Sequence, residues 1–360
     1  MPYRLEDGEA IDAALRRCAR EQLDSALDQL TTGVRADRER AVHEARKSLK
    51  KERSLLRLGR TALPRDLRRH ENAVFRQAAR TLSARRDNDA MIAALDDLAD
   101  RYAGQLPKSV FAEIHTHLAA DRERGPVDSR LDDRATASDM RATIRDVRFR
   151  DDRATGRDGR ATARDGRATI PDDGATVLDD LAAARNRIND WRLRRAGWSA
   201  VGGGLSRSYR LGRTTFRRAV TEANVESLHE WRKRAKDLWY QLRILRPLAP
   251  HALGGHADDA HQLSDLLGDD HDLAVLRAAV VAIGGDLRGD PDAMLGLIDH
   301  RRHQLQTHAR AVGERLYAET PKAFIRRVHR YWKTWRREAR VAAAGRPVEL
   351  AQATRRAPIA

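Results

Sequence analysis

Cysteine is almost absent from this chain of 360 residues, because Cys18 is its only one, and a single cysteine excludes an internal disulfide. Long apolar runs are absent too, since none approaches the roughly 18 to 20 residues that a helix needs to span a bilayer. The residues that follow Met1 contain no apolar core of a signal peptide. We therefore expect a cytoplasmic protein that does not enter a membrane.

Signals for β-strands are also scarce. Aromatic residues make up 5% of the chain, and runs of β-branched residues are rare, whereas both are typical of strands. Apolar residues recur mostly at intervals of three and four, which is the period of an amphipathic helix. The sequence therefore predicts an all-α fold, with prolines and glycines between the helices.

Acidic residues are fewer than basic ones. The 69 lysines and arginines exceed the 53 acidic residues, so the net charge is +16 and the isoelectric point is about 10.6. A positive potential of this size attracts phosphate-bearing partners or anionic membranes. Only eight of the cations are lysines, and the planar fork of arginine suits bidentate contacts with phosphate. GC-rich codon usage is a second explanation for the share of arginine.

Residues 124–176 differ from the rest of the chain. The triplet Arg-Ala-Thr begins at positions 134, 141, 153, 160 and 167, and large apolar side chains are almost missing. Such a segment buries too little surface to offset the entropy of ordering its backbone. We therefore expect a disordered or loosely ordered insertion and look for function outside it.

The segments on either side of the insertion are related. Residues 42–50 (VHEARKSLK) match residues 228–236 (LHEWRKRAK), and residues 82–89 (LSARRDND) follow the first motif much as residues 267–273 (LGDDHDL) follow the second. An internal duplication is the simplest explanation. We predict two similar helical halves that pack around a pseudo-two-fold axis and are followed by a tail. Their ranges are 1–123 and 177–345, with the tail at 346–360.

Each repeated motif predicts a helix with a cationic stripe beside an apolar one. On a helix that advances 100° per residue, Val42, Ala45, Leu49 and Leu56 form the apolar stripe of the first motif, with basic residues about 100° away. Leu228, Trp231, Ala235 and Leu242 form that of the second. A solvated face normally mixes charges of both signs, whereas these stripes contain no carboxylate. The stripes indicate an anion-binding groove, and a basic face with snorkelling arginines is the alternative.

A third basic helix is predicted after Gly202, Gly203 and Gly204. Free backbone N–H groups at its start could bind a phosphate, although the loop lacks the Gly-Lys-Ser/Thr ending of a P-loop. A flexible hinge with a helix cap is the alternative. The candidate polyanion contacts from the three helices are His43, Arg46, Lys47, Lys50, Arg53, Arg57, Arg207, Arg210, Arg213, Arg217, His229, Arg232, Lys233, Lys236 and Arg243.

These motifs, duplicated and in this order, resemble the CHAD family, the conserved histidine α-helical domain. The matching residues are His43-Glu44-x-Arg46 with Lys50 and Arg53, Arg86-Asp87, Tyr209-Arg210-x-x-Arg213, His229-Glu230-x-Arg232-Lys233-x-x-Lys236, Leu267-Gly268 with Asp272, and Glu319-Thr320-Pro321-Lys322-Ala323-Phe324. The resemblance implies two antiparallel helical bundles around a basic cleft or pore that binds inorganic polyphosphate, with association with polyphosphate granules. Ser83 in place of glycine, the unequal pair Ala45 and Trp231, and the insertion depart from the pattern.

Two other functions compete with this one. Residues 256–272 contain a cluster of histidines and aspartates, among which His271-Asp272 is similar to the metal-binding pair of HD-type phosphohydrolases. A basic groove also contacts any nucleic-acid backbone, but the stripes lack aromatics for base stacking. We expect a non-catalytic binding domain that needs neither a metal nor an organic cofactor. Tyr331, Trp332 and Trp335 have the spacing of a buried helix face.

Overall fold

The computed structural model describes residues 3–82, 87–124, 173–284, 287 and 290–353. These residues form helices, and their only β-contact is an isolated bridge between Ala103 and Leu106, which confirms the all-α prediction. Nearly all of the predicted insertion lies outside the described residues. The helix before it ends at Arg124 and the helix after it begins at Asp173.

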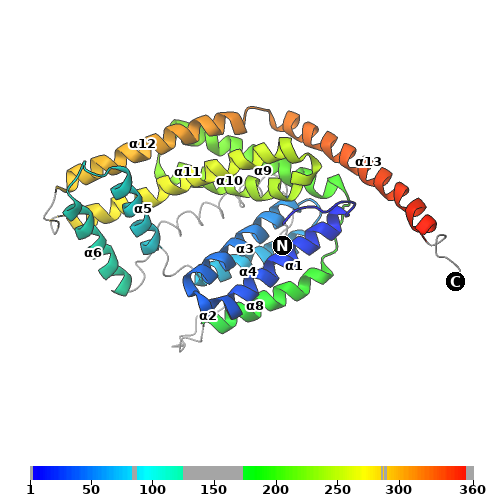
Figure 1. Cartoon of the computed structure of the whole chain (residues 1–360), viewed down its shortest axis with the longest axis horizontal. Coiled ribbons are helices and arrows are strands. Elements are labelled where there is room, and N and C mark those ends of the chain that lie inside the picture. The colour runs from blue at the N-terminus through cyan, green and yellow to red at the C-terminus, as the bar shows by residue number, and fades with distance from the viewer. Residues whose placement is uncertain (1–2, 83–86, 125–172, 285–286, 288–289, 354–360) are drawn as a thin grey trace, which may run out of the picture.

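Four helices pack into a first bundle (Figure 1). They are α1 (Ile11–Asp28), α3 (Arg38–Leu58), α4 (Arg65–Thr81) and α8 (Asp173–Arg187). A π-helical turn at Gln29–Gly33 and the short α2 (Val34–Ala36) connect α1 to α3. The helix α3 begins where the side chain of Asp37 accepts a hydrogen bond from the backbone N–H of Arg40, which satisfies a free helix donor.

Five helices form the second bundle. They are α9 (Trp198–Glu222), α10 (Val225–Leu245), α11 (Pro250–Ile283), α12 (Pro291–Leu316) and α13 (Pro321–Ala353). The side chain of Asn224 caps α10 by accepting a hydrogen bond from the N–H of Ser227, as Asp37 caps α3. In Figure 1, α13 extends away from the rest of the bundle toward the C-terminus.

The order of the helices along the chain does not follow the division into two bundles. The helices α5 (Asp87–Arg101) and α6 (Lys108–Arg124) precede the insertion, yet α5 packs on α11, and both share a core with α11 and α12. The helix α8 follows the insertion, yet it packs on α1 and α4. Each bundle is therefore built from both sides of the insertion, and α13 continues through much of the predicted tail.

The apolar stripes of the motif helices lie in one large core. Ala45, Leu49 and Leu56 of α3 are buried, and so are Trp231 and Ala235 of α10. These side chains fix the rotation of each helix, because turning them outward would expose the apolar surface that drives packing. The basic residues beside them therefore lie at the margin of the core.

The predicted helix start after the three glycines is wrong. Gly202, Gly203 and Gly204 lie inside α9, which begins at Trp198, so their N–H groups do not form the open end of a helix. A Cβ atom at Gly204 would overlap the backbone carbonyl oxygens of Arg57 and Leu58. Glycine is needed there because α9 packs directly on the C-terminal end of α3. The triplet indicates close helix packing and not a phosphate loop.

Candidate functional site

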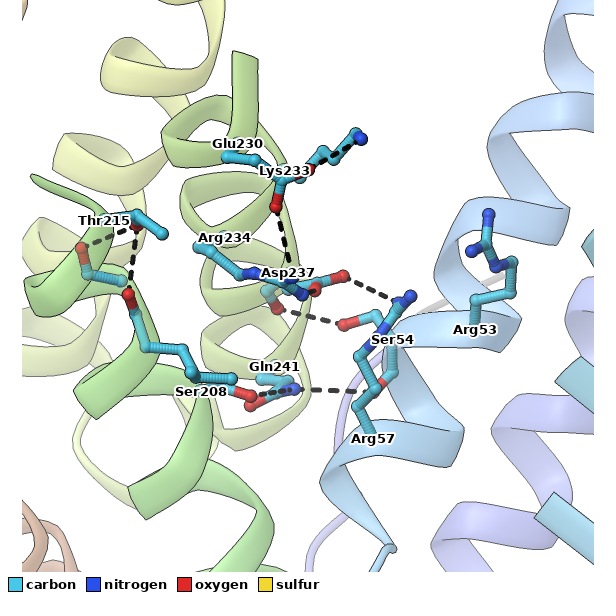
Figure 2. A network of polar contacts seen from close by, with 12 residues as sticks. Arg53, Ser54, Arg57, Ser208, Thr215, Glu230, Lys233, Arg234, Asp237 and Gln241 are labelled. Atoms are coloured by element: carbon cyan, nitrogen blue, oxygen red, sulfur yellow. Dashed lines mark hydrogen bonds and ion pairs between the residues drawn. The ribbon is translucent and has the colours of Figure 1, made fainter. Parts of the chain in front are cut away.

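The two motif helices meet at a polar junction. The hydroxyl of Ser54 on α3 donates a hydrogen bond of 2.9 Å to the backbone carbonyl of Asp237 on α10. Arg57 Nη1 forms an ion pair of 2.9 Å with Asp237 Oδ1, and Figure 2 shows Arg57 on α3 pointing toward Asp237 on α10. Gln241 on α10 donates to Ser208 Oγ on α9 over 2.8 Å. These contacts fix the relative positions of α3, α9 and α10.

The basic stripe of α3 precedes this junction. Arg46 Nη1 donates a hydrogen bond of 3.2 Å to the carbonyl of Leu82, and Arg53 Nε donates one of 3.2 Å to Asn72 Oδ1. Both acceptors, a backbone carbonyl and a side-chain amide, are uncharged, and they orient the two guanidinium groups. The candidates on this stripe are half-buried, and so is Arg57 at the junction. These candidates are His43, Arg46, Lys50 and Arg53.

The stripe of α10 lies beside α11. Arg232 lies against Gly268 of α11, where a Cβ atom would come within 3.0 Å of its Nη2 atom. Arg46 and Arg232 occupy equivalent motif positions, and each packs beside the second motif of its own half. Lys233 forms an ion pair of 2.8 Å with Glu230. Arg232, Lys233 and Lys236 are half-buried.

The charges of both stripes act on His229. Its ring lies beside that of His271 on α11, with 4.5 Å between the ring centroids. Burial, followed by His271, Lys233, Arg232 and Lys50, lowers the pKa of His229 to about 2. Lys50 belongs to α3, so the cationic faces of α3 and α10 share one electrostatic environment. His229 is a neutral imidazole in this environment.

The four candidate arginines of α9 do not converge on one point. Arg207 is half-buried and lies near Arg68 of α4, whose pKa is lowered by burial and then by Arg65, Arg69 and Arg207. Arg213 lies near Tyr209, which is in the core. Arg210 and Arg217 are exposed.

Lys47 and Arg243 surround a lysine that the sequence analysis missed. Burial, followed by Arg243 and Lys47, lowers the pKa of Lys51 to about 8. Lys47 pairs with Glu44 over 3.2 Å, and the guanidinium of Arg243 lies 5.4 Å from the ring centroid of Trp239. The sequence did show Lys51 beside Lys50, but adjacent residues project about 100° apart around a helix, which places Lys51 off the predicted stripe.

Arg68 and Asp237 were also missed. Arg68 adds a cation from α4 beside Arg207, and the basic run Arg65 to Arg69 was its signal in the sequence. Asp237 holds Arg57 in place. An aspartate between cationic positions carries no sequence signal that separates an anchor from an ordinary surface carboxylate.

The histidine and aspartate cluster of α11 does not converge either. His261 Nδ1 lies 2.6 Å from Asp265 Oδ2 beside an open pocket that Asp258 and Asp269 also line. His271 faces His229, whereas the ring of His256 stacks on Phe324. Within the described ranges, no group of three or more histidine, cysteine, aspartate or glutamate side chains is placed to hold a metal ion.

The fold and the junction define a class: all-helical proteins in which a duplicated basic motif is presented on two contacting helices. The family model of the CHAD domain matches residues 17–281, from α1 to α11, and the chain belongs to the CHAD family.

The fold is similar to that of a solved structure. PptA from Streptomyces chartreusis matches with a TM-score of 0.50 and 16% sequence identity, over 85% of this chain and 98% of that one. None of the curated proteins matches this chain. Among the described helices, none combines the length and apolar character needed to cross a bilayer.

Proposed function

We propose that the protein binds inorganic polyphosphate along the basic stripes of the contacting helices α3 and α10. Membership of the CHAD family supports this function. The observation that carries it is the direct contact of the two motif helices, in which Ser54 and Arg57 of α3 bond to Asp237 of α10. In keeping with this contact, Lys50 of α3 joins Arg232 and Lys233 of α10 among the cations that lower the pKa of His229.

The arrangement suits a chain of closely spaced negative charges. Like charges held together repel one another, and half-buried charges have lost part of their hydration. A polyanion offsets both effects at once and accepts charge-assisted hydrogen bonds from several cations. The protein supplies binding without bond-breaking chemistry in this proposal, and polyphosphate granules in the cytoplasm are the expected place of action.

Calorimetric titration with long-chain polyphosphate tests the function, using the variant Lys50→Gln/Lys236→Gln. These lysines hold equivalent motif positions on the two stripes, and we expect the variant to bind about tenfold more weakly, a loss of about 1.4 kcal/mol. The matched control is Arg277→Gln/Arg310→Gln, which removes the same charge from two surface ion pairs on α11 and α12 and should bind as the parent does.

Salt and competition separate polyphosphate binding from general attraction. The affinity should fall as salt rises because counterions are released on binding, and the fall should be shallower in the lysine variant. Duplex DNA at equal phosphate concentration should compete poorly. Equal affinity for both polymers, or an equal loss in the two double variants, would mean that the stripes are a general basic surface.

A further inference from the structure

A second basic stripe runs along α13, outside the residues that the CHAD model matches. Its members are spaced three or four residues apart, which places them all within about 80° of one another around the helix and along about 27 Å of its length. All six are exposed. The α13 stripe consists of Lys322, Arg326, Arg330, Lys333, Arg337 and Arg340.

Several surface cations elsewhere in the molecule have a carboxylate beside them. Four exposed pairs show this pattern on α5, α9, α11 and α12, namely Arg101–Asp97, Arg218–Glu222, Arg277–Asp299 and Arg310–Glu314. Within the described part of the chain, no ion pair involves a member of the α13 stripe. Glu338, the acidic residue of α13 nearest to them in sequence, points about 120° away from the centre of the stripe around the helix.

The opposite face of α13 keeps the stripe turned outward. Phe324, Val328, Trp332 and Trp335 are buried in the large core, and the ring of Phe324 stacks on Tyr209 of α9 with 4.1 Å between centroids. Rotating the helix to bring the stripe inward would expose these aromatic side chains. The like charges are therefore held in one line, although neighbouring like charges on a helix repel each other.

We propose that the α13 stripe is a second binding site for polyphosphate, which a chain already bound at α3 and α10 also contacts. This inference rests on the proposed function. A linked second contact raises the overall affinity without improving either site, because the bound chain is present at a high local concentration. Nucleic acid fits the stripe less well, since Trp332 and Trp335 are buried and offer no surface for base stacking.

The test compares long and short polyphosphate chains on the full-length protein. The variant Arg330→Gln/Lys333→Gln/Arg337→Gln removes the centre of the α13 stripe and changes only exposed side chains. We expect long chains to bind it about tenfold more weakly, because the linked contact is lost. Short chains that cannot reach both sites should bind the α3 and α10 stripes as tightly as in the parent.

The matched control is Arg101→Gln/Arg277→Gln/Arg310→Gln, which removes three charges from surface ion pairs. A loss confined to the α13 variant and to long chains supports the second site. Equal losses in the two triple variants, or no loss in either, overturn it. If the parent binds no polyphosphate at all, the proposed function itself fails. If long chains bind the α13 variant as tightly as the parent while Lys50→Gln/Lys236→Gln binds them more weakly, the second site is overturned and the proposed function stands.

Discussion

Glu52 is a buried carboxyl group that should make the protein less stable as the pH rises. It lies on α3 with its side chain fully buried, and neither carboxyl oxygen has a hydrogen-bond partner within the described residues. Burial, followed by the charge of Glu71, raises its pKa well above the ordinary 4.5. The folded protein therefore holds Glu52 in its neutral form, while the unfolded chain ionises it.

The sign and size of the effect follow from linkage. A raised carboxyl pKa leaves stability unchanged below about pH 4.5 and removes up to about 1.4 kcal/mol per pH unit above it, until the folded pKa is reached. Between pH 5 and pH 7 the unfolding free energy should therefore fall by up to about 2.5 kcal/mol through this group alone. Glu52→Gln keeps the shape of the side chain and cannot ionise, so it should lack this loss.

Urea unfolding followed by tryptophan fluorescence at the two pH values measures the difference. Other groups titrate in the same interval, so the quantity of interest is the change in stability of the variant minus that of the parent. The control is Glu338→Gln, which removes an exposed carboxylate on α13 and should follow the parent. If the Glu52 variant and the parent lost stability in parallel, the burial argument would be wrong.

Two further predictions concern packing and acid pH. Gly204→Ala should cost about 3 kcal/mol or more, measured by the same unfolding assay, because the new methyl group overlaps the end of α3; Gly255→Ala, with open space around its Cβ position, should not. The pKa of His229 is lowered from 6.5 to about 2, so its contribution to stability is full above pH 6.5 and is lost as the pH falls. His229→Gln should therefore lose up to about 2 kcal/mol less than the parent on acidification to pH 5, and equal acid losses would contradict this.

The sequence predicted the fold class and the motif helices because their signals are local. Ala45 and Leu49 recur at helical spacing in the first motif, and Trp231 and Ala235 do so in the second. Once these side chains are buried, helix geometry alone places Arg46 and Arg232 at the margin of the core. The spacing of apolar residues is therefore sufficient to predict which face of a single helix is buried.

Contacts between distant segments could not be predicted in this way. A run of glycines indicates a break or a close approach, and only the position of Leu58 relative to Gly204 shows which applies. The ion pair of Arg57 with Asp237 likewise depends on how α3 and α10 meet. The α13 stripe did have a local signal, cations at spacings of three and four, but it lies outside the duplicated motifs on which the prediction rested.

Each bundle contains helices from both sides of the insertion, so the order of synthesis affects how the protein folds. During synthesis α1, α3 and α4 emerge well before α8. Glu71 of α4 therefore has no access to Arg187 of α8, with which it forms an ion pair of 2.8 Å in the folded protein, until α8 has been made. The apolar sides of α5 and α6 are uncovered until α11 and α12 follow. Neither bundle can complete its packing while the first half of the chain is still being synthesised. Folding of the whole protein therefore depends on helices that are synthesised late.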